Sequence, residues 1–337
     1  MKSRTSRLNG LVSSLGGRQY IYIAFALSAA AFWVSWTNYF GYSRDYENYE
    51  YFFNLLRYRF SSFFNTHRFE PAFAMIARLL VAFVQSNEMV YALFVAPAVF
   101  LKILLMGRWS KGYVFFALAV LLYFFRFFPL HELTQVRASS ALVFIMFSLY
   151  YRVQNRFYMA AAFGMTAFLF HYSSALVVPF IFLPELKAKE VVLLGASLFF
   201  GIYIFSLQIV PIAATYFTSI ESTLRSIVDS DGLNPLSPLL YPEYFMIFVS
   251  LIFWEDLTRA MRFIVSMQIF GLAMGLAFYD FPVLAVRSHE LFIFLWVFFV
   301  AQASHCRMEV KIAVIAFTGA MSFLGIYVYY MSNFFIY

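Results

Sequence analysis

The chain has 337 residues, of which 63% are hydrophobic, 22% aromatic and only 12% charged, and its mean hydropathy is +0.76. This composition is typical of a polytopic membrane protein and leaves no room for a separate soluble domain. The formal net charge is +7, but the Lys and Arg residues are spread over short turns, so we expect no nucleic-acid partner.

The first expected element is a membrane-spanning helix from Tyr20 to about Phe40. A basic arm, 1–19, precedes it and no small-residue cleavage motif is present, so we interpret it as a retained helix whose arm stays in the cytoplasm. The next stretch, 41–70, is polar and lies on the opposite side. Its apolar residues recur at helical spacing, which predicts an amphipathic helix on the membrane surface: Tyr49, Phe52, Phe53 and Leu56.

Apolar runs then follow one another, separated by short turns. They cover 71–86, 89–106, 113–130, 138–151, 157–171, 172–184, 191–211, 243–254, 263–280, 289–304 and 311–330. With the first helix included, we expect an all-α fold, in which residues 1–337 form a single integral membrane domain of about 11–12 transmembrane helices.

Five of the turns carry paired basic residues, which indicates a cytoplasmic position. They contain Arg108 with Lys111, Arg152 with Arg156, Lys187 with Lys189, Arg259 with Arg262, and Arg307 with Lys311. The turns at 131–137, near 171, at 212–242 and at 281–289 then share the other side. Two full crossings between 71 and 106 would place the basic turn with Arg108 and Lys111 on the non-cytoplasmic side. We therefore expect 71–86 to be re-entrant or interfacial. The Pro-rich loop 212–242 is expected to hold a short interfacial helix.

Charged residues on the non-cytoplasmic side fall at or near segment ends. Charge within a membrane costs roughly 2.5 to 3.5 kcal/mol per residue, so each case is a functional hypothesis. The first group is Arg44, Asp45, Tyr46 and Tyr49. Tyrosine rings stack on the apolar faces of sugars while Asp and Arg bind hydroxyls, although the same residues also suit the aromatic belt of a bilayer interface.

Glu70 and His171 are the next candidates. Glu70 precedes Pro71 at a helix start, where the helix dipole stabilises a carboxylate, so it is either a simple capping acid or a functional group. His171 breaks a long, nearly uncharged apolar run into two short pieces. A lone histidine is commonly structural, but in a membrane it favours function, because imidazole can donate to phosphate or exchange a proton.

Arg137 follows His131 and Glu132 in a polar turn and opens the small-residue run 138–141. Small residues let helices pack closely, which favours a guanidinium held inside the bundle over one that snorkels to the interface. A diphosphate is the partner that the planar fork of Arg matches best.

Arg287 supplies a second guanidinium on the same side, followed by His289 and Glu290. Adjacent positions do not present two side chains on one helical face, so we expect no metal there, and the single Cys306 excludes a multi-cysteine metal site. The GxxxG spacing of Gly271 and Gly275 predicts tight helix packing.

In order along the chain, these motifs resemble those of one family over about residues 40–300: Arg44-Asp45-Tyr46 with Tyr49, Glu70-Pro71, Gln135-Val136-Arg137-Ala138, Phe170-His171-Tyr172-Ser173-Ser174-Ala175, and a late helix opened by Arg287. The chain resembles the Wzy-type O-antigen and exopolysaccharide polymerases, in the EpsG-like branch. The resemblance implies a bacterial inner-membrane glycosyltransferase of the multi-helix GT-C-like architecture, with its active site facing the periplasm. It lacks the long, strongly basic external loop of the larger polymerases, which leaves the glycan-binding loop undefined.

Such enzymes join undecaprenyl-diphosphate-linked oligosaccharide repeats, without a metal or other cofactor. With the residues above, we expect Arg137 and Arg287 to bind the diphosphate and Asp45, Glu70 and His171 to serve catalysis. Expected substrate-binding residues are Arg44, Tyr46, Tyr49, His131, Glu132 and His289. Expected partners are the lipid-linked oligosaccharide, membrane lipids, a chain-length-regulating co-polymerase and a flippase.

Three other classes remain open at this point. A flippase or transporter for lipid-linked oligosaccharide predicts charges at mid-bilayer depth and repeat symmetry. A membrane acyltransferase that modifies sugars would use a histidine together with a second acid or histidine. A structural assembly subunit would leave Arg137, His171 and Arg287 without a role.

Overall fold

The structure, a computed structural model, describes residues 2–39, 45–58, 69–110, 112–216, 234–279 and 282–331. All regular elements in these ranges are helical. Eight of the described helical segments are long and apolar enough to cross a membrane, and Pro71–Phe83, Phe157–Phe170 and Tyr241–Ile252 are shorter apolar helices. The expectation of an all-helical polytopic bundle is confirmed.

Most helices follow the apolar runs of the sequence, but the run 172–184 forms only two short helices, Tyr172–Leu176 and Val178–Ile181. Their bounds are α1 (Lys2–Val34), η1 (Ser35–Tyr39), α2 (Tyr46–Tyr58), α3 (Pro71–Phe83), α4 (Asn87–Trp109), α5 (Tyr113–Leu122), η4 (Tyr123–Phe127), α6 (Phe128–His131), α7 (Val136–Val153), α8 (Phe157–Phe170), η5 (Tyr172–Leu176), α9 (Val178–Ile181), α10 (Ala188–Tyr216), α12 (Tyr241–Ile252), η6 (Trp254–Asp256), α13 (Arg259–Ala277), α14 (Pro282–Ile293), α15 (Trp296–Gln302), η7 (Ala303–His305), α16 (Met308–Ile326) and η8 (Tyr327–Met331).

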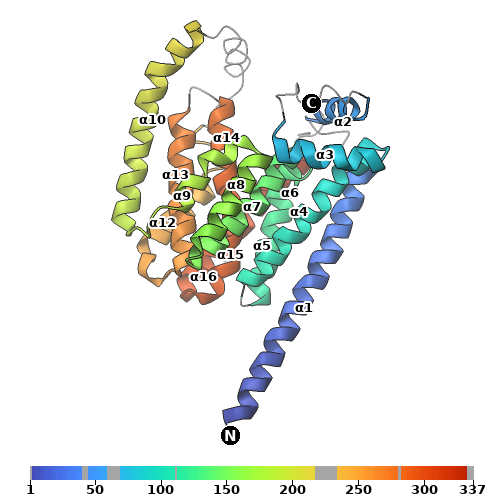
Figure 1. The fold of residues 1–337 in the computed structure, drawn as a ribbon. Coiled ribbons are helices and arrows are strands. Elements are labelled where there is room, and N and C mark those ends of the chain that lie inside the picture. The colour runs from blue at the N-terminus through green and yellow to red at the C-terminus, as the bar shows by residue number, and fades with distance from the viewer. Residues whose placement is uncertain are drawn as a thin grey trace.

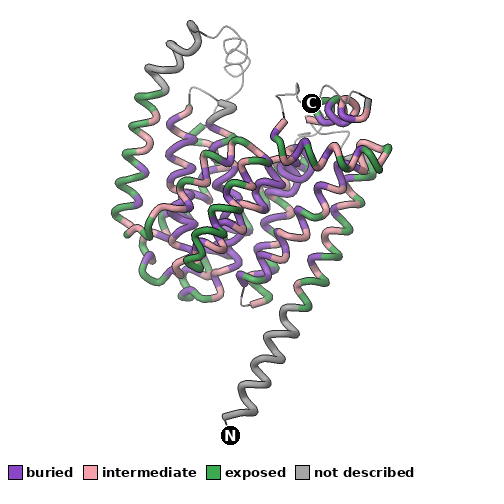
Figure 2. Tube along the Cα trace, in the orientation of Figure 1, coloured by how far each residue is buried: buried purple, intermediate pink, exposed green. Residues whose placement is uncertain are grey.

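Central and peripheral helices differ in what they bury. In the membrane-spanning part of α13, 78% of residues are buried inside the protein, whereas only 11% of the residues in the corresponding part of α10 are buried. Figure 2 shows the same contrast, with α10 largely exposed and the central helices largely buried. The exposed residues of α10 include large apolar side chains such as Leu193, Phe200 and Phe205. Such a surface suits lipid and not water.

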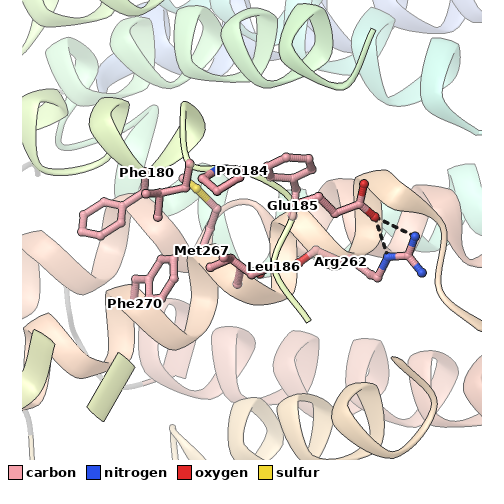
Figure 3. Close-up of a pocket in the computed structure, with 10 residues that line it drawn as sticks. Phe180, Pro184, Glu185, Leu186, Arg262, Met267 and Phe270 are labelled. Carbon is pink, nitrogen blue, oxygen red and sulfur yellow. Dashed lines mark hydrogen bonds and ion pairs between the residues drawn. The ribbon is translucent and has the colours of Figure 1, made fainter. Parts of the chain in front are cut away.

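The basic turns gather at one end of the bundle. Arg259 at the start of α13 donates to the carbonyl of Val153, the last residue of α7, at 3.2 Å. Arg262 pairs with Glu185 at 2.7 Å. Figure 3 shows this ion pair beside a small apolar pocket. Gln302 donates to the carbonyl of Trp109 at 3.1 Å, which brings two further turns to the same end.

The polar site candidates lie at the other end. Arg137 and Arg152 stand near opposite ends of α7, so their Cα atoms are about 22 Å apart. Figure 1 shows α2 and α3 at the end of the bundle opposite the N-terminus of α1, with α3 lying across the ends of the long helices. With 13 residues, α3 is about 20 Å long, too short to span a hydrocarbon core of about 30 Å.

Helix α2 has the apolar face that its sequence predicts. Tyr49, Phe52, Phe53 and Leu56 are each at most 2% exposed. This face packs on protein: the ring of Phe52 stacks on that of Phe69 at 3.8 Å. The aromatic cluster therefore holds the start of α3 beneath α2 and fixes the position of Glu70, the residue next to Phe69.

Candidate active site

Glu70 is the N-cap residue of α3 and has the extended backbone usual at that position (φ −67°, ψ 146°), but its side chain makes no capping hydrogen bond. The buried carboxylate instead binds the Arg137 guanidinium at 2.9 Å and Nδ1 of His171 at 3.0 Å. It also accepts from the backbone N–H of Tyr172 at 3.3 Å. The interpretation of Glu70 as a simple capping acid is therefore wrong.

His171 reaches Glu70 because the helix breaks there. Helix α8 ends at Phe170, His171 is extended (φ −157°, ψ 114°), and the short helix η5 follows. The break that the sequence predicts at this position is present. It turns the ring toward α3 and frees the N–H of Tyr172 to bind the same carboxylate.

The protonation of this pair follows from the environment of Glu70. Burial raises the pKa of Glu70, but the hydrogen bond from His171 and the charge of Arg137 lower it by a larger amount. The resulting pKa is about 2. The carboxylate is thus ionised at neutral pH and has no proton to donate. Nδ1 of His171 must therefore donate to it, which in the neutral ring leaves Nε2 as the nitrogen with a free lone pair.

Arg137 is held from three directions at the start of α7. Besides its bond to Glu70, its Nε lies 3.5 Å from the hydroxyl of Tyr49, and its guanidinium lies 4.7 Å from the ring centroid of Phe69. The side chain is still 24% exposed. Burial raises the pKa of Tyr49, and the nearby Arg137 opposes this, so the phenol keeps its proton. The guanidinium is therefore pre-oriented and remains partly exposed.

Arg137 also lines a cavity into which several distant segments project. Its lining is Asp45, Tyr49, Gln135, Arg137, Ala138, His171, Arg287, Glu290 and Leu291. Arg287 is exposed and makes no hydrogen bond or ion pair with the part of the chain that the structure describes. Gln135 donates to Glu290 at 3.3 Å. Because carboxylates share the lining with the two arginines, the guanidinium groups must act on an anion locally, not through a net positive field.

A family model for the EpsG family matches residues 9–337. The chain belongs to the EpsG family. Membership indicates a polysaccharide polymerase-type function with glycosyltransferase-like chemistry in a multi-pass membrane protein. No curated protein and no solved structure matches the chain.

Most of the expected site residues of this EpsG-family protein meet at the one cavity. Asp45, Tyr49, Arg137, His171 and Arg287 line it, and Glu70 lies directly behind Arg137 and His171. Arg44 lies outside the described residues, as does the side chain of Tyr46.

Two polar lining residues were not among the site residues expected from the sequence. Gln135 and Glu290 both line the cavity. A signal for Glu290 was present, because it follows Arg287 by three residues and therefore shares its helical face.

His131 and Glu132 lie elsewhere, which corrects the expectation that they bind substrate. Both are fully buried in the bundle interior. Glu132 pairs with Lys102 at 2.5 Å and accepts from Tyr123 at 2.7 Å. The ring of His131 packs on that of Phe294, and neither of its nitrogens has a hydrogen-bond partner among the described residues. The polar turn thus serves an internal ion pair that joins α4 to α6 and α7.

His289 of this EpsG-family protein also points away from the first cavity. Its Nε2 lies 2.7 Å from a carboxylate oxygen of Glu243, and both side chains are buried. The pair joins α14 to α12. The buried pairs of Glu243 and Lys102 could not be predicted from the sequence, because each residue lies in a mainly apolar segment and its partner is distant in the chain.

Proposed function

We propose that this protein is a metal-independent polymerase that joins undecaprenyl-diphosphate-linked oligosaccharide repeats into O-antigen, capsule or exopolysaccharide at the periplasmic face of a bacterial inner membrane. One observation carries the proposal: two arginines and a carboxylate-oriented histidine from distant segments line a single cavity. EpsG-family membership supports the polymerase class.

The sidedness rests on the distribution of basic turns. These turns gather at the end of the bundle that carries Arg259, Arg262 and Trp109, whereas the cavity lies at the far end of α7. Basic turns remain in the cytoplasm during insertion. The cavity then opens toward the periplasm, where a lipid diphosphate lies at the level of the membrane surface.

The arginines suit the leaving group. When the growing glycan leaves its lipid carrier, negative charge develops on the diphosphate, and pre-oriented donors stabilise that charge most effectively. Arg137 is fixed by Glu70, Tyr49 and Phe69, while Arg287 has no competing partner among the described residues. Both present the planar fork that matches phosphate oxygens.

His171 suits the proton transfer better than Glu70 does. A carboxylate with a pKa of about 2 is a weak base, and both of its oxygens are already occupied. In the proposed step, an acceptor hydroxyl oxygen bonds to the anomeric carbon of the donor sugar, and the bond from that carbon to the diphosphate oxygen breaks. The hydroxyl proton passes to Nε2 of His171, and the lipid diphosphate leaves with the electron pair. Asp45, on the cavity wall, binds acceptor hydroxyls.

The decisive experiment is polymerisation by purified protein in detergent with lipid-linked repeats isolated from the producing strain. The wild type should produce a ladder of chain lengths, which a flippase or transporter cannot do. Arg287→Ala should remove products longer than one or two repeats, with a loss of about 10²-fold or more, the typical value of one transition-state charge contact.

Arg307→Ala is the matched control. Arg307 is an exposed arginine at the basic end, 3.5 Å from Asp256, and its loss should leave the ladder unchanged. A normal ladder from folded Arg287→Ala protein would refute the assignment of the diphosphate to this cavity.

A further inference from the structure

A second, larger cavity lies on the other side of α14. Its empty volume is about 1400 Å³, including the part open to solvent, compared with about 400 Å³ for the first cavity. It is bounded by η4, the segment before α12, the end of α13, α14 and η8. These elements meet at the same end of the bundle as the first cavity.

Helix α14 separates the two cavities, and Glu290 belongs to both linings. Arg287 and Leu291 face the first cavity, whereas Val286 and His289 face the second. Glu290 is held toward the first cavity by the bond from Gln135. The carboxylate therefore stands at the place where the contents of the two cavities meet.

The lining of the second cavity combines aromatic rings with uncharged hydrogen-bonding groups. Tyr279 contributes an exposed ring, whereas Tyr329 is only 4% exposed. Asn234 and Ser237 contribute an amide and a hydroxyl. Sugars present apolar faces to rings and hydroxyls to planar polar groups, so this mixture fits a carbohydrate. Aliphatic side chains complete the lining: Leu239, Leu240, Val286, Ile293 and Val328.

A diphosphate fits this cavity poorly. Arg126 is the guanidinium in its lining, and its Nη1 already donates to the hydroxyl of Tyr329 at 2.6 Å. The same guanidinium lies 5.4 Å from the centre of the Tyr329 ring.

We propose that the second cavity binds the sugar residues of the acceptor repeat, and that Glu290 positions the acceptor sugar by accepting a hydrogen bond from a hydroxyl other than the one that attacks the donor. This inference rests on the proposed function, because it assigns the donor diphosphate to the first cavity. The acceptor hydroxyl lies on a sugar and must reach the anomeric carbon beside that diphosphate. A sugar subsite that adjoins the first cavity at Glu290 would bring the acceptor hydroxyl close to that carbon.

The test uses two probes that each carry one half of the substrate chemistry. The first is the repeat-unit oligosaccharide released by mild acid from the lipid-linked repeats of the producing strain, which has sugars and no diphosphate. The second is farnesyl diphosphate, which has a diphosphate and no sugar. Dissociation constants for both are measured with the purified full chain in detergent.

The variant that fills the cavity is Ser237→Trp, and its matched control is Leu236→Trp, because Leu236 is 74% exposed and does not line the cavity. Ser237→Trp should weaken oligosaccharide binding at least tenfold and leave farnesyl diphosphate binding unchanged. Leu236→Trp should change neither. Arg287→Ala should show the reverse pattern and weaken only farnesyl diphosphate binding.

The milder variant Asn234→Ala keeps the test valid if Ser237→Trp does not fold, and it should weaken oligosaccharide binding at least threefold. Glu290→Gln should retain binding of both probes but lower the rate of chain extension at least tenfold. Oligosaccharide that binds equally to wild type and to both cavity variants, or that does not bind the wild type, would overturn the sugar subsite. A dissociation constant for farnesyl diphosphate that is the same in Arg287→Ala and in the wild type would instead overturn the proposed function.

Discussion

The ionised state of Glu70 leads to a quantitative prediction for Glu70→Gln. The pKa of Glu70 falls from 4.5 to about 2 because burial, which raises it, is outweighed by the hydrogen bond from His171 and the charge of Arg137. A tenfold change in acidity corresponds to about 1.4 kcal/mol, so the ionised carboxylate stabilises the folded state by about 3 kcal/mol. Because the Glu70 side chain is only 4% exposed, solvent screens little of this energy.

The substitution keeps the shape of the side chain but removes its charge. An amide NH₂ group would face the donors of Arg137 in place of a carboxylate oxygen, so at least one of the present bonds must be lost. We expect Glu70→Gln to lower the free energy of unfolding by about 3 kcal/mol at pH 7, which corresponds to a fall in Tm of about 5 °C for a chain of this size.

The pH dependence has a definite sign. The folded pKa lies below the unfolded value, so the contribution is fully present above pH 4.5 and is lost as the pH falls toward 2. Melting of the detergent-solubilised protein, followed by tryptophan fluorescence, should therefore show a constant difference between wild type and Glu70→Gln from pH 7 to about 5. The difference should shrink at lower pH.

Glu185→Gln is the matched control for this measurement. Glu185 also binds an arginine, at 2.7 Å, but its side chain is 35% exposed, so its loss should cost less than about 1 kcal/mol. Equal melting temperatures for the two variants, or a difference that vanishes between pH 7 and 6, would show that Glu70 is not the buried ionised group inferred here.

Three further variants probe the chemistry and the packing. His171→Ala should lower the rate of chain extension about 10²- to 10⁴-fold in the ladder assay and leave farnesyl diphosphate binding nearly unchanged; an unchanged rate would exclude His171 as the base. Gly271→Ala would drive a Cβ into the side chain packed on it and should cost about 1 to 3 kcal/mol in melting experiments, whereas Gly319→Ala meets no atom within 4 Å and should be neutral or slightly stabilising. Lys102→Met leaves the Glu132 carboxylate buried without its cation and should cost about 3 to 5 kcal/mol, most of which the double variant Lys102→Met/Glu132→Gln should restore.

The bundle could be predicted from the sequence because hydropathy and helix length are local properties. The apolar run 138–151 corresponds to helix α7 (Val136–Val153), and the run 263–280 corresponds to helix α13 (Arg259–Ala277). A short apolar segment before Asn87 was expected not to cross, and α3 is indeed too short to do so. The tight packing predicted at Gly271 is also present, since the side chain of Phe292 lies against it.

The cavity lining was only partly predictable, because a sequence places a residue at a helix end but not on a particular side of it. His131 and Arg137 flank the same turn, yet the first packs on Phe294 in the interior and the second opens to the cavity. Pairing is also a tertiary property. Glu243 binds a histidine 46 positions later, and no local pattern around Glu243 indicates that partner.

The two cavities depend on one another through α14. Its buried side is fixed by the bond between His289 and Glu243 and by the contact of Phe292 with Gly271, while Arg287 and Glu290 project from its other positions toward the first cavity. A packed helix moves as a unit, so a change that displaces α14 moves the proposed diphosphate ligand Arg287 and the proposed sugar contact Glu290 together. The distance between donor and acceptor is then set by the packing of α14, not by the loops around it. A misplacement of about 1 Å at a reacting pair can cost about 10²-fold in rate. Gly271→Ala should therefore reduce chain extension by more than its loss of stability explains, even though Gly271 lines neither cavity.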